Sequence, residues 1–289
     1  MSPDAAQRAL APPISILVLT KNEEQDLPAC LDSVAWSDDV HVFDSCSTDR
    51  TAEIAAARGA RVTRRPFDGF ASQRNAALHG LPFEHGWVLT LDADERVPLP
   101  LARALAAFVD DPPDDVAACR IRRRDFLGRT WLERSQISPY YVRLVRPHRV
   151  RYRREVNEVL DVDGAIHDLA EPFDHYPFSK GMRHWLDKHN VYSSMEASCA
   201  LDSRRGETPF SLRKAFLASD FNERRFHQKE LFYRMPLRPF AKFLYVYFWR
   251  RGFLDGSAGF TYATLQAIYE YMIVLKAREL EQRGAAPAG

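Results

Sequence analysis

Residues 86–95 read Gly-Trp-Val-Leu-Thr-Leu-Asp-Ala-Asp-Glu, an apolar run that ends in closely spaced carboxylates. The run from Gly86 to Leu91 predicts a buried strand, because it is short, uncharged and followed by polar residues. Asp92 and Asp94 would then lie at the carboxyl end of that strand, where open α/β sheets bind their ligands. Such a pair favours a site for Mg²⁺ or Mn²⁺ with a phosphate-bearing ligand, although a solvated acidic turn gives the same short pattern.

Two further apolar runs end in a comparable way, which favours the ligand site over the acidic turn. Residues 14–19 are followed by Thr-Lys-Asn-Glu-Glu at 20–24, and residues 40–43 by Asp-Ser-Cys-Ser-Thr-Asp at 44–49. Each run predicts a strand whose carboxyl end opens through a polar turn into a helix. The ends of these strands would together form one crevice.

The remaining pattern of the first half alternates helix and strand. Residues 27–34 place apolar side chains at i, i+3, i+4 and i+7, the spacing of a helix that packs on a sheet. Gly59 is expected to end a helix that begins at Thr51. The other expected elements are strands at 61–63 and 86–91 and helices at 70–79 and 99–109.

The pattern changes after residue 115. Short runs rich in Arg, Tyr and Val between residues 116 and 160 predict antiparallel strands that complete the sheet. A helix is expected from about residue 180 to 201, with Trp185, Tyr192 and Met195 on one face. The predicted fold class is therefore α/β: a mostly parallel mixed sheet, Rossmann-like and flanked by helices, with a C-terminal helical extension.

Composition bounds the class of protein. The chain has 289 residues, of which 46% are hydrophobic, enough for a sizeable core. Its 4 cysteines have no paired or metal-binding spacing, which indicates reduced thiols in a cytosolic protein. Residues 1–13 are expected to be a flexible N-terminus; they lack a basic region followed by an apolar core, so no secretory signal is predicted. We expect a cytoplasmic location.

The net charge of +1 hides a strong segregation of charge along the chain. Residues 1–119 carry 10 Lys/Arg and 19 Asp/Glu, residues 120–154 carry 12 Arg and 2 acids, and residues 203–254 carry 12 Lys/Arg and 4 acids. The basic blocks suit a diphosphate, a phosphorylated lipid or an anionic leaflet, although a solvated helix face is the alternative for either block. Nucleic acid is not an expected partner, because the acidic half would repel phosphates and no recognition motif is present.

The C-terminal region holds two helical candidates. Residues 237–249 combine aromatic residues with Arg238 and Lys242, and this helix is too short and too charged to span a bilayer but suits its interfacial plane. Residues 258–275 approach spanning length, but Gln266 and Glu270 interrupt them. Two alternatives to membrane contact remain for these residues. They form a helical hairpin that packs on the α/β part of the chain, or they form the contact of a homo-oligomer.

The order of these motifs along the chain resembles that of a known family. The order Thr-Lys-Asn-Glu at 20–23, Asp-Ser-x-Ser-x-Asp at 44–49, Gln-Arg-Asn at 73–75 and Leu-Asp-Ala-Asp-Glu at 91–95 resembles the family 2 glycosyltransferases of GT-A fold. Within them, Arg-Arg-Gly-Phe-Leu-Asp-Gly at 250–256 resembles a block of the bacterial lipopolysaccharide-core β-glucosyltransferases. The resemblance covers about residues 14–275.

The resemblance implies an organisation of the chain. Residues 14–178 would be the GT-A catalytic domain, with a nucleotide-sugar half at 14–115 and an acceptor half at 116–178. Residues 179–289 would be a helical extension that lies near the membrane or forms an oligomer.

The resemblance also implies roles for single residues. Asp94 would be the principal metal ligand, Asp92 would contact the ribose or reach the metal through water, and His175, in a His-Tyr pair, would be a later ligand, although a lone histidine is as often structural. The residues implied to hold the nucleoside are Thr20, Glu23, Asp44 and Asp49, and those implied to approach the phosphates and sugar are Arg74 and Asn75. For Asp49 the alternative is a helix N-cap.

One position departs from the family pattern. Relatives carry Val-His-Glu after the basic β segment, whereas this chain has Val156, Asn157 and Glu158. Glu158 is the candidate general base, because inverting transfer needs a base on the acceptor side of the sugar. Asn157 can form hydrogen bonds but cannot titrate as imidazole does, so any role of that histidine is lost here.

These residues predict an inverting, metal-dependent glycosyltransferase that uses Mg²⁺ or Mn²⁺ and a UDP-sugar, with glucose as the expected sugar. Its acceptor would be a lipid-linked saccharide of lipopolysaccharide or another envelope glycan, and the enzyme would be peripheral on the inner face of the cytoplasmic membrane. Polyprenyl phosphate as acceptor and a non-catalytic nucleotide-sugar-binding module are the alternatives. The sequence leaves the linkage open.

Overall fold

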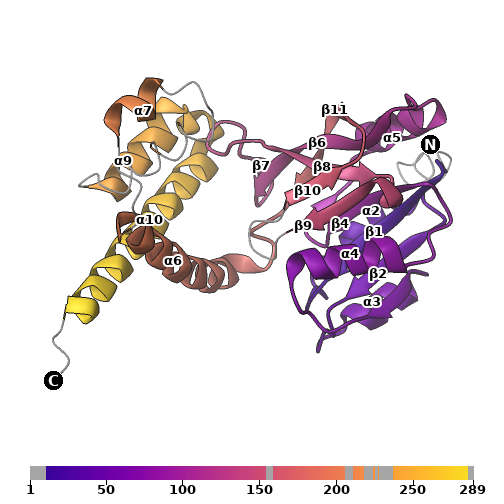
Figure 1. Ribbon diagram of the computed structural model, residues 1–289, viewed down its shortest axis with the longest axis horizontal. Coiled ribbons are helices and arrows are strands. Elements are labelled where there is room, and N and C mark those ends of the chain that lie inside the picture. The colour runs from indigo at the N-terminus through magenta and orange to yellow at the C-terminus, as the bar shows by residue number, and fades with distance from the viewer. Residues whose placement is uncertain are drawn as a thin grey trace. The chain divides into compact units, whose positions relative to one another are not determined.

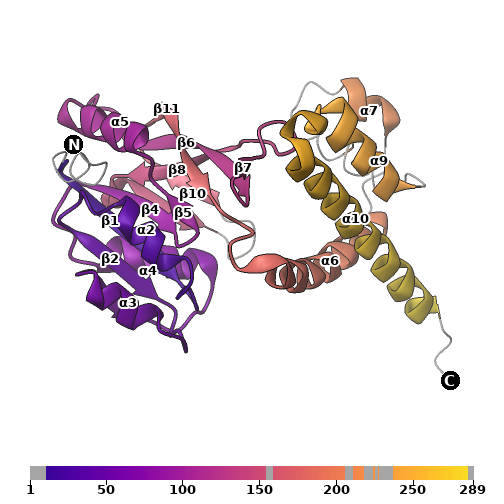
Figure 2. The ribbon, with the colours of Figure 1, turned by 180° about the vertical axis from the view of Figure 1, so that it is seen from behind.

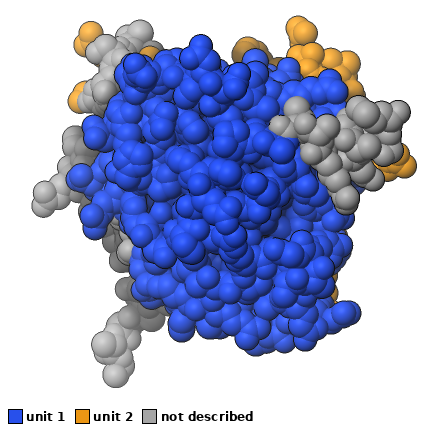
Figure 3. All heavy atoms as spheres, turned by 90° about the vertical axis from the view of Figure 1, so that its right-hand side faces the viewer, with its two compact units in different colours: residues 1–128, 138–180 blue, residues 129–137, 181–289 orange. Residues whose placement is uncertain are grey.

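The computed structural model describes residues 11–153, 159–205, 211–217, 224, 227 and 237–285. The chain divides into two compact units, which Figure 3 colours separately. Unit 1 comprises residues 1–128 and 138–180, and unit 2 comprises residues 129–137 and 181–289. Unit 1 is built on a β-sheet, and the described part of unit 2 is mostly helical.

The main sheet of unit 1 has the strand order β3-β2-β1-β4-β8-β6-β11-β5, and the short strand β7 belongs to unit 2. The first four strands are parallel, β8 is antiparallel to both of its neighbours, and β11 is parallel to β6. The predicted mostly parallel mixed sheet is thus confirmed. The strands are β1 (Ile14–Thr20), β2 (Val40–Asp44), β3 (Arg61–Arg64), β4 (Trp87–Asp92), β5 (Glu95–Arg96), β6 (Val116–Leu127), β7 (Thr130–Trp131), β8 (Tyr140–Val145) and β11 (Ala165–His175).

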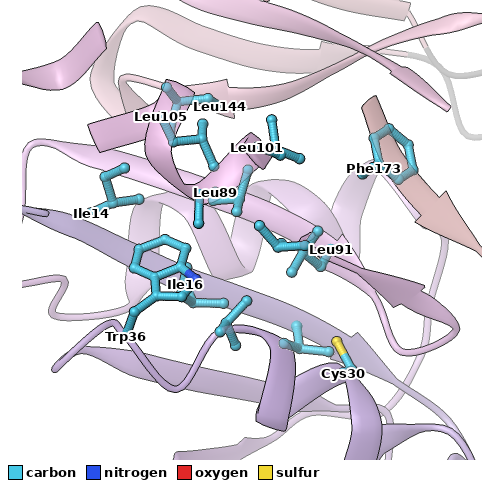
Figure 4. Packing of buried hydrophobic residues seen from close by; sticks show 14 of the residues in the cluster. Ile14, Ile16, Cys30, Trp36, Leu89, Leu91, Leu101, Leu105, Leu144 and Phe173 are labelled. Atoms are coloured by element: carbon cyan, nitrogen blue, oxygen red, sulfur yellow. The ribbon is translucent and has the colours of Figure 1, made fainter. Parts of the chain in front are cut away.

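The central strands are buried on both faces, which is why they are continuous apolar runs and not alternating ones. Ile14, Ile16 and Val18 of β1 lie in one cluster, and Leu17 between them lies in a second. Figure 4 shows the first cluster, in which β1 and β4 meet α2 and α5. Helix α4 covers the opposite face, and Figures 1 and 2 show the sheet from its two sides.

The helices of unit 1 begin and end close to the predicted positions. Gly59 follows α3 with φ 81°, a left-handed conformation that ends the helix at little cost for glycine. The helices are α2 (Leu27–Ser33), α3 (Thr51–Ala57), α4 (Phe70–Gly80), α5 (Leu99–Asp110) and the 3₁₀ turn η1 (Pro147–Arg149).

A separate two-stranded ribbon also belongs to unit 1. Its antiparallel strands are β9 (Val150–Arg153) and β10 (Val159–Val162). Apolar side chains of both strands join the cluster beneath α4, so the ribbon and α4 cover the same face of the sheet.

Unit 2 centres on two long helices that pack on each other. Trp185, Ser193 and Ala197 of α6 are buried, whereas Tyr192 and Met195 are 43% and 55% exposed. The predicted shared face is therefore wrong: a four-residue spacing sets the buried face, because small side chains let α10 approach α6. The elements are α6 (Gly181–Arg205), α7 (Leu212–Leu217), α9 (Arg238–Leu244), the π-helix η2 (Tyr245–Trp249), the 3₁₀ turn η3 (Gly252–Asp255) and α10 (Gly256–Ala285).

Residues 129–137 join unit 2 through hydrogen bonds to η2 and η3. Asp255 accepts hydrogen bonds from the backbone N–H groups of Arg134 at 3.0 Å and Ser135 at 2.7 Å. Arg250 donates to the carbonyl oxygens of Arg134 at 2.9 Å and Gln136 at 3.1 Å. The Arg-Arg-Gly-Phe-Leu-Asp-Gly block at 250–256 therefore holds this loop in place through hydrogen bonds. Within the described ranges, no helix combines the length and the apolar character needed to cross a membrane.

Candidate active site

The carboxyl ends of three parallel strands bring several predicted site residues to one edge of the sheet. In the register of β1 with its neighbours, Thr20 lies opposite Asp44 and Leu19 lies opposite Asp92. The Thr20 hydroxyl donates a hydrogen bond to Asp44 Oδ1 at 3.0 Å. Asp44 is fully buried and also accepts the backbone N–H of Ser47 at 2.9 Å, so its position is set by the turn after β2.

A cavity of about 370 Å³ lies at this edge. The rings of Phe67 and Phe70 form an edge-to-face pair with centroids 5.0 Å apart, and both side chains are about half exposed. The sequence assigned no role to these two residues; the available signal was an aromatic residue on each side of Asp68 and Gly69. The lining residues are Leu19, Thr20, Lys21, Ser45, Phe67, Phe70, Gln73, Arg74 and Asp92.

Two arginines hold Asp92. Arg143 Nη2 lies 3.0 Å from Asp92 Oδ2, and Arg74 Nη2 lies 3.6 Å from Asp92 Oδ1. Burial raises the pKa of Asp92, but the charges of Arg143 and Arg74 together lower it by more, so the net pKa is about 2. The carboxylate is therefore ionised and paired with cations at neutral pH.

Arg143 also bonds Glu95, so one guanidinium serves two carboxylates. Glu95 is buried and accepts the backbone N–H of Asp92 at 3.0 Å. Burial raises the pKa of Glu95 to about 7, although Arg143 opposes this change. No role for Arg143 was predicted from the sequence. Its signal was a charged residue within the short, otherwise mostly apolar run of β8.

Asp94 faces a histidine that a second carboxylate orients. Asp94 Oδ2 lies 3.2 Å from His175 Nε2, and Asp125 Oδ1 lies 2.5 Å from His175 Nδ1. Burial lowers the pKa of His175, but the hydrogen bonds to Asp125 and Asp94 raise it by more, so the net pKa is about 9. Asp125 comes from β6 and His175 from β11, which are parallel neighbours with these two residues in register. No feature of the sequence pointed to Asp125.

This arrangement fits a divalent cation. A metal-binding histidine usually donates its other ring nitrogen to a carboxylate, which fixes the ring and its basicity. Asp125 takes that place here, so Nε2 of His175 and the carboxylate of Asp94 converge. In the described part of the chain, no three His, Cys, Asp or Glu side chains form a complete metal site. Among the described residues, Asp94 and His175 would be the protein ligands, and phosphate oxygens and water would supply others.

Glu23 lies beside the same carboxylates. Its Oε1 is 2.7 Å from Lys180 Nζ, and its Oε2 is buried with no hydrogen-bond partner among the residues that the structure describes. Burial raises the pKa of Glu23, Lys180 lowers it, and the charges of Asp94 and Asp26 raise it. The net result is a pKa of about 7. Glu23 thus adds to the negative charge around Asp94 when it ionises.

Two predicted site residues lie elsewhere, and a third falls outside the described residues. Asn75 is not in the cavity lining; its amide bonds the backbone carbonyl and N–H of Tyr152 at 2.8 and 2.9 Å, which ties α4 to β9. Asp49 accepts the N–H groups of Thr51 at 3.0 Å and Glu24 at 3.1 Å, so it joins the start of α3 to the turn after β1; the N-cap position of α3 is Arg50. Glu158 and its neighbour Asn157 lie outside the described residues.

Comparison with known families decides the affiliation of the chain. Residues 15–167, which include the cavity, match the model of "Glycosyl transferase family 2". The chain belongs to this family. The sheet of unit 1 is accordingly the GT-A fold of these glycosyltransferases.

This glycosyltransferase has relatives of similar length. It is 27% identical to the lipopolysaccharide core biosynthesis glycosyltransferase LpsC of Rhizobium meliloti, over 92% of this chain and 95% of the relative. It is also 27% identical to an uncharacterized glycosyltransferase of Rickettsia bellii, over 92% of this chain and 86% of the relative.

Solved structures show more distant likenesses. S. aureus TarS (residues 1–349) in complex with UDP-GlcNAc is 17% identical with a TM-score of 0.44, over 93% of this chain and 91% of that one. Glucosyl-3-phosphoglycerate synthase from Mycobacterium tuberculosis, in complex with Mn²⁺, UDP-glucose and phosphoglyceric acid, is 25% identical with a TM-score of 0.31, over 42% of this chain and 46% of that one.

Proposed function

We propose that this glycosyltransferase moves a hexose, with inversion, from a UDP-sugar to a saccharide acceptor of lipopolysaccharide or a related envelope glycan. One observation carries the proposal: Asp92 lines the cavity at the ends of β1 and β4, and two residues later Asp94 meets His175, which Asp125 orients. A site for a nucleotide and a site for a divalent cation therefore share the same edge of the sheet.

The cavity suits the nucleotide. Its volume of about 370 Å³ is in the range of small-molecule sites. Asp44 and Thr20, already bonded to each other, would hold the nucleoside, and Phe67 and Phe70 would pack against an aromatic base. Arg74 would bind the diphosphate. Its long contact with Asp92 would then be replaced by a charge-assisted hydrogen bond to a phosphate oxygen.

Asp94 and His175 would hold Mg²⁺ or Mn²⁺, and Asp92 would contact the ribose or reach the cation through water. Such a cation, when bound, stabilises the negative charge that develops on the leaving diphosphate. Asp125 fixes the ring of His175, and Arg143 keeps Asp92 ionised and in place. These residues thus set the position of the diphosphate before reaction.

Glu158 is the proposed general base that takes the proton of the acceptor hydroxyl. The next carboxylates along the chain, Asp161 and Asp163, line a different cavity with basic residues of η1 and β9, and Asp161 is ion-paired with Arg153. Their engagement there supports Glu158 for the role.

Glucose and lipopolysaccharide are the finer part of the proposal. They are supported by the resemblance of residues 250–256 to the core β-glucosyltransferases and by the name of the Rhizobium relative, which spans nearly the whole chain. A location on the inner face of the cytoplasmic membrane follows from a lipid-linked acceptor of this kind.

The test is a donor panel with a matched pair of variants. We expect hydrolysis or transfer of a UDP-hexose that requires Mg²⁺ or Mn²⁺, and we expect Asp94→Ala to abolish it and to weaken UDP binding in the presence of Mn²⁺. Asp111→Ala removes an exposed carboxylate of the same unit and is the control. Full turnover and equal UDP affinity in Asp94→Ala would disprove the metal assignment. If product formed with polyprenyl phosphate but not with a core saccharide, the acceptor would be polyprenyl phosphate and not a saccharide.

A further inference from the structure

The helix formed by α9 and η2 exposes its apolar face. Six of its large apolar side chains are between 39% exposed, at Leu244, and 81% exposed, at Trp249. They recur at i, i+3, i+7, i+8, i+11 and i+12, the period of an amphipathic helix, whose apolar face normally lies against the protein. We call this face the exposed stripe: Leu237, Phe240, Leu244, Tyr245, Phe248 and Trp249.

The opposite face, against α10, carries a buried charge. Arg238 is 4% exposed, and its Nε lies 2.6 Å from Glu270 of α10. Phe243 and Tyr247 stack with ring centroids 5.3 Å apart, and both pack on Phe260 of α10. Figures 1 and 2 both show α9 beside α10. The helix therefore packs aromatic side chains and an ion pair against α10, and it still has a second apolar face, the exposed stripe, that points outward.

Basic residues border the stripe without acidic ones. Residues 237–254 contain no Asp or Glu and four Lys/Arg: Arg238, Lys242, Arg250 and Arg251. Arg238 is bound to Glu270, and Arg250 is bound to carbonyl oxygens of the loop at 134–136. Lys242 and Arg251 form no ion pair within the described residues, and Arg251 is exposed. These two cations can therefore meet an anionic partner.

A cavity of about 380 Å³ opens beside the start of the stripe. Leu237, Pro239, Phe240 and Val274 are its apolar lining residues, and Arg238, Tyr271 and Arg278 complete the lining. An apolar pocket with a cation suits a lipid phosphate together with the first part of its acyl chain.

We infer that the exposed stripe docks in the interfacial plane of an anionic phospholipid leaflet. Aromatic and aliphatic side chains of such a stripe enter the headgroup region, and Lys242 and Arg251 meet lipid phosphates. A two-fold contact between copies is disfavoured, because it would bring the same cations together with no acid of the segment to offset them. The inference rests on the proposed function for its purpose, since a lipid-linked acceptor lies in that leaflet.

Vesicle sedimentation of the full chain tests the inference. The vesicles contain phosphatidylcholine alone or phosphatidylcholine and phosphatidylglycerol in equal parts. We expect binding to the mixed vesicles, and we expect the double variant Phe248→Ser with Trp249→Ser to lose roughly tenfold or more in partition. The matched control is Val191→Ser with Met195→Ser, which removes apolar side chains of α6 that are 59% and 55% exposed and should bind as the wild type does.

A second pair of variants tests the charge. Lys242→Gln and Arg251→Gln should each weaken binding roughly fivefold and reduce its dependence on salt. Wild-type protein that ignores mixed vesicles, or a stripe variant that binds them equally, would overturn the inference. So would a dimer, measured by sedimentation equilibrium, that the stripe variant dissociates. UDP binding by calorimetry without lipid is measured on the same proteins, so a failure of the proposed donor site is seen separately.

Discussion

Replacing Arg143 by methionine tests whether the carboxylate cluster depends on one cation. The Arg143 side chain is 7% exposed, its Nη2 lies 3.0 Å from Asp92, and it also bonds Glu95. Methionine keeps an unbranched apolar stem and removes the charge. The substitution therefore leaves Glu95 buried without the cation that holds it.

The expected loss follows from the burial of this pair. Breaking a buried ion pair by removing one partner usually costs about 3–5 kcal/mol of the free energy of unfolding. Domains are stable by only about 5–15 kcal/mol. Glu95 limits the loss, because burial has already raised its pKa to about 7 and it can take up a proton. We therefore expect a loss of about 3 kcal/mol, of which Glu95→Gln in the same background should restore a part.

The loss should depend on pH. The pKa of Glu95 in the folded protein, about 7, exceeds the ordinary 4.5, so its ionisation destabilises the fold as pH rises through this interval. Without Arg143 the folded pKa is higher still, and the interval extends upward. Arg143→Met should consequently lose more stability at about pH 8 than at about pH 6.

Urea unfolding followed by hydrogen exchange of peptides from β4 and β8 measures the sheet unit separately from the helices. The control is Arg120→Met, which breaks an ion pair with Asp168 whose side chains are 47% and 48% exposed. Exposed pairs contribute at most about 1 kcal/mol. If Arg143→Met lost no more than Arg120→Met, the reasoning about the cluster would be refuted.

Four further predictions concern the proposed reaction. Glu158→Gln should retain UDP binding and lose transfer by about 10²-fold or more, measured by product formation, and near-wild-type turnover would place the base elsewhere. Asp125→Asn should raise the metal concentration for half-maximal activity about 10–100-fold, and His175→Ala should raise it too; unchanged metal titrations would make both residues structural. Because the pKa of His175 is raised to about 9, a proton competes with the metal, so wild-type metal affinity should increase between about pH 7 and about pH 8.5. Phe67→Ser with Phe70→Ser should weaken UDP binding about tenfold by calorimetry, whereas equal affinity would exclude stacking on the base.

The sequence by itself determined the parallel half of the sheet and the edge where the site forms. The strands at 14–20, 40–44 and 87–92 are continuous apolar runs, and each ends in a polar turn within a residue or two of its predicted end. Local spacing is sufficient for this, because burial on both faces of a strand requires such a run wherever it lies in the sheet. Parallel pairing then brings Thr20, Asp44 and Asp92 together without further information.

Only the tertiary structure decided which distant side chains meet there. His175 and Asp125 are 50 residues apart in sequence, and their contact depends on the register of β11 with β6. Arg143 reaches Asp92 because β8 pairs antiparallel to β4, which no local pattern specifies. Asn75 looks like a ligand residue in sequence, but packing of α4 on β9 uses both ends of its amide.

The same holds for the C-terminal helices. Local composition predicted an aromatic and basic helix near residues 237–249, and periodicity gives its apolar face. Which face is buried depended on α10, whose Glu270 pairs with Arg238 and whose Phe260 packs on Phe243 and Tyr247, while the apolar stripe stays exposed. The spacing of residues in one helix defines its faces, whereas the partner across the interface decides which of them meets water.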